Sequence, residues 1–171
     1  MSETERIKTA FERQTKAVTL REGIGKGTAV TTARVRNGLT VDVTEGPFRF
    51  TVDSNPKWGG NDEGPNPGVY GRGALAACLA QGYMMWAARL DVPVDDVVVA
   101  VHADYDTRGM CAVGDAGAAY RQVRVKVSLT SNAPPADIER VLSEAEAHSP
   151  YFTIFKQGLD LRRDGFEAAG A

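Results

Sequence analysis

The sequence predicts an α+β protein in which an antiparallel sheet packs against one long apolar helix. Residues 28–53 read as three short strands with no helix between them, so neighbouring strands can pair antiparallel. Residues 71–90 form a helical run with almost no charge before its last turn. Two further strands and one clear helix follow. A chain of 171 residues is long enough for one such domain and too short for two.

The N-terminal part of the chain precedes this domain. Residues 3–17 can form an amphipathic helix whose apolar residues gather on one side. Residues 21–27 contain three glycines and are typical of a connector. We therefore divide the chain into an N-terminal helix with its connector, residues 1–27, and a single domain over residues 28–171.

The first three strands are separated by turns. Residues 28–35 and 39–44 flank Asn37 and Gly38, a two-residue hairpin signal because both turn positions tolerate positive φ. Residues 48–53 follow after a second turn. Apolar and polar residues alternate in the second and third strands, which gives each of them one buried face.

A loop and the long helix come next. Residues 54–68 are rich in glycine and proline, so we expect a loop of functional length. The loop lacks the GxGxxG and GxxxxGK[ST] patterns and does not predict nucleotide binding. The helix over residues 71–90 is apolar nearly all round and must be covered on several sides. A domain of this size has little to cover it with, which favours a dimer.

The C-terminal third contains two strands and a helix. The strands, residues 97–104 and 120–130, are joined by a turn-rich segment that places Cys111 near a hairpin end. The last clear helix ends before Pro150, since proline stops a helix. Residues 151–163 read as a mixed tail with room for a short final strand.

Composition excludes several classes of function. A net charge of −2 gives no general attraction to nucleic acid or to an anionic membrane surface. The longest apolar run, residues 74–80, is far shorter than the roughly 20 residues that span a bilayer. The charged N-terminus lacks the apolar core of a signal peptide. We therefore expect a cytoplasmic protein with neither nucleic acid nor a membrane as partner.

Cysteine and histidine are scarce. The chain has only two of each, Cys78, Cys111, His102 and His148, and none shows metal-ligand spacing. We expect no metal site and no cofactor. In a reducing compartment the two thiols are expected to be free.

Cys78 lies in the middle of the apolar helix, and the sequence allows two interpretations of it. A free cysteine there can pack as a small apolar side chain. A reactive thiolate would need a nearby positive charge, because the effect of the helix dipole falls off within the first turn. Any such charge must come from elsewhere in the fold.

The segment from Pro67 through Cys78, with ALAACLA inside a long apolar helix, resembles the OsmC/Ohr family of hydroperoxide-handling proteins. Three further features agree. Strands that carry RNG precede the helix, a GGNDEGPNP loop leads into it, and a late helix ends in AHSPY. The resemblance covers roughly residues 28–160. It implies a two-layer α+β fold and an intertwined homodimer, with each active site at the subunit interface.

The resemblance also implies roles for particular residues. Cys78 matches the peroxidatic cysteine, whose thiolate attacks a peroxide and becomes a sulfenic acid. Arg36 matches the arginine that holds the thiolate ready, with Arg34 as a substitute on the same strand face. Either arginine can equally be read as a solvated side chain.

Two positions depart from the family pattern. Gly68 stands where the family has a glutamate, and Ser149 stands where it has a second cysteine. A serine cannot form the disulfide that an external dithiol reduces in the family. Glu63 and Cys111 are candidate replacements, the latter if its hairpin folds toward Cys78. Cys111 also reads as an incidental turn residue.

Two functions remain open. In the first, Cys78 alone reduces an organic hydroperoxide in oxidative-stress defence, and a thiol or dithiol reductant restores it. In the second, the protein is not catalytic and binds a small apolar ligand at the dimer interface, lined by Tyr83, Met84, Met85 and Trp86, which equally read as core. The retained cysteine and arginine favour the peroxidase, whereas the two departures argue against efficient turnover.

Overall fold

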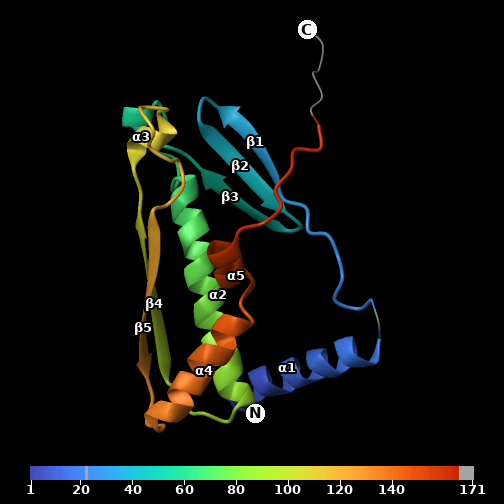
Figure 1. The fold of residues 1–171 in the computed structure, drawn as a ribbon. Coiled ribbons are helices and arrows are strands. Elements are labelled where there is room, and N and C mark those ends of the chain that lie inside the picture. Colours follow the sequence, from blue (N-terminus) through green and yellow to red (C-terminus); the bar gives the residue numbers. More distant parts are fainter. Residues whose placement is uncertain (22, 166–171) are drawn as a thin grey trace.

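A computed structural model describes residues 1–21 and 23–165 (Figure 1). Glu22 of the predicted connector and the last residues of the predicted domain, 166–171, lie outside the described residues. The elements follow one another in the order α1 (Glu3–Leu20), β1 (Thr32–Asn37), β2 (Thr40–Glu45), β3 (Phe48–Val52), η1 (Pro56–Trp58), α2 (Pro67–Arg89), β4 (Asp96–Asp104), α3 (Thr107–Met110), β5 (Gln122–Thr130), α4 (Pro135–Ala147) and α5 (Pro150–Gln157).

Helix α2 runs through the middle of the molecule, as Figure 1 shows. Strands β4 and β5 lie along one side of it, and α4 and α5 lie along another. The sheet of β1, β2 and β3 lies at the end where α2 begins, and α1 crosses the end where α2 finishes. The predicted α+β class is confirmed. No helix in the described part of the chain is long and apolar enough to cross a membrane.

The strands form two antiparallel sheets where one was predicted. One has the order β1-β2-β3, and the other pairs β4 with β5 from Asp96 opposite Thr130 onward. The predicted hairpin is present, with Gly38 at a φ of 56°. Strand β1 begins at Thr32 instead of residue 28. Since β2 ends at Glu45, the residues before Thr32 have little backbone left to pair with.

The core lies between α2 and the sheet of β4 and β5. Leu75, Leu79 and Tyr83 of α2 are fully buried against Ala145 of α4 and against the inward-facing valines of both strands. The Tyr83 hydroxyl donates a hydrogen bond of 3.0 Å to Glu146. Burial and the Glu146 carboxylate both raise the pKa of Tyr83, so its hydroxyl stays protonated at neutral pH.

Other apolar faces are uncovered. Gly73, Ala77, Gln81 and Met85 recur every four residues along α2, and all four are exposed. We call this row the open stripe of α2. In the three-stranded sheet, Phe48 is 73% exposed. The described part of the chain therefore leaves this one row of α2 exposed.

Helix α1 is held to the end of α2 by aromatic and charged contacts. Phe11 meets the edge of Trp86 with ring centroids 5.6 Å apart, and the Arg89 guanidinium lies 4.9 Å from the centroid of each ring. Lys8 pairs with Asp91 at 2.6 Å. No residue of α1 is fully buried, so its attachment rests on these contacts.

Three predicted boundaries differ from the structure. Helix α2 begins at Pro67, four residues early, because Asn66 caps it and accepts the Val69 amide. Residues 151–163 contain no strand. Instead, Ser149 caps α5 with Pro150 in its first turn, a position that suits proline. The turn-rich segment between β4 and β5 includes the short helix α3.

The buried carboxylate of Asp53 orders the loop between β3 and α2. Asp53 is 1% exposed, immediately after β3. Its oxygens accept hydrogen bonds of 2.7 to 3.2 Å from one hydroxyl and three backbone amides: Thr40 Oγ1 and the amides of Ser54, Asn61 and Glu63. Burial alone would raise the pKa of Asp53, but these hydrogen bonds outweigh it and hold the pKa below its usual value.

We expect Asp53 to make the stability of the fold sensitive to acid. Because its pKa is depressed in the folded state, the stabilisation is present at neutral pH and is lost as the pH falls below about 4. Asp53→Asn should lower the melting temperature at pH 7 and flatten its dependence on pH in this acid range. The control is Asp62→Asn, at an exposed residue of the same loop. Equal melting curves for wild type and Asp53→Asn would contradict this role.

Candidate functional site

Cys78 lies at the border between the buried and the exposed faces of α2. Leu75, one turn before it, is fully buried, whereas Gln81, one turn after it, belongs to the open stripe. Cys78 itself is half-buried. Its thiol is therefore partly protected by the core and still open toward the uncovered side of the helix.

The side chain of Ser149 touches this thiol. The distance from Cys78 Sγ to Ser149 Oγ is 3.3 Å, and Ser149 is only 4% exposed. The same hydroxyl oxygen accepts the Phe152 amide at 3.2 Å as the N-cap of α5. The N-terminus of α5 thus lies against Cys78. A helix N-terminus carries partial positive charge.

The structure brings two predicted site residues, Arg36 and Glu63, together at a different place. Arg36 of β1 donates to Glu63 at 2.8 Å and lies 3.4 Å from an oxygen of Asp42. The Asp53 carboxylate holds the Glu63 amide, which keeps this part of the loop beside β1. Arg34 lies opposite Asp42 in the strand register. Among the described residues, no hydrogen bond or ion pair joins either arginine to Cys78.

The second turn of α2 holds an arginine, Arg72, that sequence reasoning missed. A Cβ added at Gly68 would lie 2.8 Å from Arg72 Nη1 and 3.3 Å from the Tyr120 hydroxyl. Arg72 donates to that hydroxyl at 2.8 Å. The volume beside Gly68 is thus taken by a guanidinium. The signal was available in the sequence, since residues four apart on a helix are neighbours.

Cys111 lies in the connection between β4 and β5. It is the C-cap residue of α3, it is exposed, and it is a free thiol. Within residues 1–21 and 23–165, neither a disulfide nor a hydrogen bond joins Cys111 to Cys78. Its role as a replacement for the second cysteine therefore stays a prediction.

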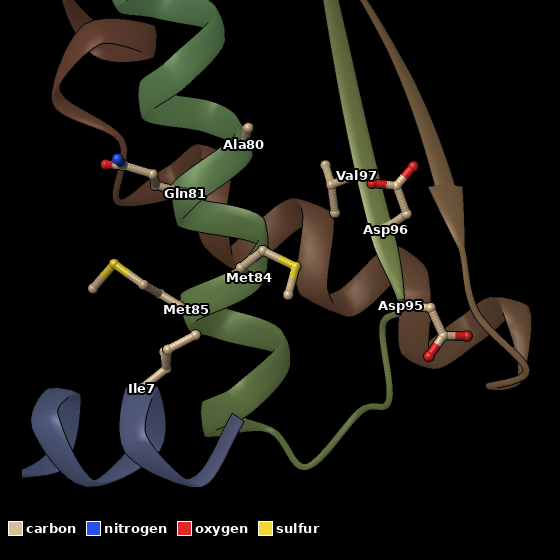
Figure 2. Close-up of a pocket in the computed structure, with 8 residues that line it drawn as sticks. All are labelled: Ile7, Ala80, Gln81, Met84, Met85, Asp95, Asp96 and Val97. Carbon is tan, nitrogen blue, oxygen red and sulfur yellow. The ribbon is translucent and has the colours of Figure 1, made fainter. Parts of the chain in front are cut away.

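An open pocket of about 520 Å³ lies between α1, α2 and the start of β4. Figure 2 shows Met84 extending toward Val97, with Ile7 of α1 beneath Met85. Of the four side chains proposed as lining from the sequence, Met84 and Met85 line it. Tyr83 is buried in the core, and Trp86 stacks on His148 with ring centroids 4.9 Å apart.

The described residues contain no group of three or more histidine, cysteine or acidic side chains arranged to hold a metal ion. The chemistry that this site offers is that of a thiol beside a buried hydroxyl.

Solved structures similar to this one share its fold. An OsmC-like protein from Mycoplasma pneumoniae is 15% identical, with a TM-score of 0.66 over 77% of this chain and 89% of that one. An organic hydroperoxide resistance protein OsmC from Legionella pneumophila is 17% identical, with a TM-score of 0.57 over 78% and 93%. One from Elizabethkingia anophelis is 16% identical, with a TM-score of 0.59 over 77% and 90%. At such identities the likeness shows the fold alone.

A comparison of the sequence with known families points to the same group of proteins as the fold does. No curated protein matches it significantly. The sequence pattern of OsmC-like proteins matches residues 59–162, a range that includes α2, Cys78, Ser149 and all of α5. This range is more than half of the chain. The chain therefore belongs to the OsmC-like protein family.

Proposed function

We propose that this protein defends the cell against organic hydroperoxides by reducing them at Cys78. The observation that carries the proposal is the half-buried thiol held 3.3 Å from the buried hydroxyl of Ser149. Membership of the OsmC-like family supports it. So do the structural neighbours from Legionella and Elizabethkingia, which are organic hydroperoxide resistance proteins.

The proposed reaction is a two-electron reduction of the hydroperoxide, in which the sulfur of Cys78 is oxidised. The Cys78 thiolate attacks the terminal oxygen of the hydroperoxide, and the O–O bond breaks. The leaving alkoxide takes a proton and departs as an alcohol, while Cys78 becomes a sulfenic acid.

The sulfenic acid must be reduced without a disulfide to Ser149. We propose that a small thiol condenses with it, which releases water and leaves a mixed disulfide. A second thiol then attacks the outer sulfur and frees Cys78.

Both cysteines are free thiols, which fits a reducing compartment, and we propose a cytoplasmic location for the protein on that ground.

A second copy of the chain completes the site in this proposal. The open stripe of α2 and the exposed Phe48 side of the three-stranded sheet are the faces it would cover. Among the described residues, no hydrogen bond or ion pair joins Arg36 to Cys78, so we propose that Arg36 acts across the subunit interface. There the ion pair with Glu63 would fix the direction of its guanidinium.

A second candidate function is the binding of a small apolar ligand without turnover. The pocket beside Met84 and Met85 favours it, because its lining is mostly apolar and Ile7 of α1 closes one wall. An unmodified Cys78 thiol after exposure to a hydroperoxide would favour this function over the first.

We expect Cys78→Ser to abolish the consumption of cumene hydroperoxide in the presence of a small thiol. In wild type, intact-mass spectrometry with a sulfenic-acid trap should find one adduct, on Cys78. The matched control is Cys111→Ser, which removes the other thiol and should keep the activity. Peroxide consumption that survives in Cys78→Ser would refute the mechanism.

A charge on the open stripe should split the proposed dimer. Ala77→Glu puts a carboxylate in the middle of the stripe, where its desolvation at an interface would cost several kcal/mol. Sedimentation or light scattering should report a dimer for wild type and a monomer for the variant. Ala100→Glu, on the exposed face of β4, serves as the control and should remain dimeric. A monomeric wild type would remove the dimer from the proposal.

Ser149→Cys should restore a disulfide partner for Cys78. The two side-chain atoms already lie 3.3 Å apart, so a sulfur at this position comes within reach of Cys78 Sγ after a small movement. Mild peroxide should then lower the intact mass by two hydrogens and remove both thiols from titration. Cys111→Ser in the same background shows that Cys111 takes no part. A persistent sulfenic acid in Ser149→Cys would mean that the two side chains do not face each other in solution.

A further inference from the structure

The hydroxyl of Ser149 has its hydrogen-bonding capacity divided between two partners. A serine hydroxyl has one proton to donate and lone pairs that accept. The Phe152 amide donates to the oxygen at 3.2 Å, so the cap bond takes a lone pair. Thr153 bonds the backbone carbonyl of Ser149 and leaves the hydroxyl alone. In the described part of the chain, the other hydrogen-bond partner of Ser149 Oγ is Cys78 Sγ at 3.3 Å. The hydroxyl proton of Ser149 is free to point toward this sulfur.

We propose that Ser149 is a positioning residue that donates its hydroxyl proton to the sulfur of Cys78 and so favours the reactive thiolate. A donor directed at sulfur stabilises negative charge on it. Ser149 is 4% exposed, so little water competes for the proton. Its use in catalysis rests on the proposed function, whereas the hydrogen bond itself does not.

This assignment differs from a purely structural role for Ser149. Capping α5 needs only an oxygen that accepts the Phe152 amide, which aspartate and asparagine also provide. Donation to sulfur needs a hydroxyl proton, which ionised aspartate lacks. Substitutions at this one position therefore separate the two roles.

The test is the rate at which iodoacetamide alkylates Cys78 at neutral pH, followed by peptide mass spectrometry. Ser149→Ala removes both roles and should slow the reaction about fivefold, as expected for the loss of one hydrogen bond. Ser149→Thr keeps both roles and should react like wild type. Ser149→Asp keeps the cap but adds a negative charge beside the sulfur, and it should react more slowly than Ser149→Ala. Cys111, exposed in the same molecule, is the internal reference and should not change.

Each outcome decides the matter. Alkylation of Ser149→Asp at the wild-type rate would show that the cap alone matters and would overturn the proposal, as would an unchanged rate in Ser149→Ala. If Ser149→Ala melts below the assay temperature, wild type and Ser149→Ala are compared at a temperature where both are folded.

The inference and the proposed function fail separately. Slow alkylation of Ser149→Ala, together with no sulfenic acid in peroxide-treated wild type, would support the hydrogen bond and remove the peroxidase. Trapped sulfenic acid in wild type, with equal alkylation of wild type and Ser149→Ala, would support the peroxidase and overturn the hydrogen bond from Ser149.

Discussion

The carboxylate of Asp53 is the constraint on which the arrangement at the start of α2 depends. One buried group ties the end of β3 to Thr40 and to three amides of the following loop. The Asp53 amide also donates to the carbonyl of Pro65 and closes the loop just before α2. Tyr70 of α2 completes the link, since its hydroxyl donates to a carbonyl of β3. A glycine-rich segment with little apolar content is thereby ordered from inside by polar contacts.

Local patterns in the sequence predicted most of the fold. Alternation identified β3 and β5, and the Asn37-Gly38 dipeptide identified the first hairpin, because these signals depend on neighbouring residues alone. Pro150 is a position where the local pattern is ambiguous, because the sequence around it predicts only the end of the preceding helix. The same proline opens α5 once Ser149 supplies the cap, and only the path of the chain decides between the two.

Local sequence patterns predicted less of the site around Cys78 than of the fold. Cys78 and Ser149 are 71 positions apart, and no periodicity connects them. Family resemblance identified both positions, but the role of the hydroxyl appeared only with its distance to the sulfur. The contact between Arg72 and Tyr120 could not be predicted from local patterns, because the two residues are 48 positions apart.

The shared hydroxyl of Ser149 has a thermodynamic consequence. It belongs both to the first turn of α5 and to the surroundings of Cys78. If the capped helix α5 stabilises one chemical form of the sulfur, then by thermodynamic reciprocity that form stabilises the capped helix by the same free energy. A covalent change at Cys78 that alters the acceptor therefore also alters the local unfolding equilibrium of α5. The fraying of this helix and the chemical state of this sulfur are therefore linked by one coupling free energy.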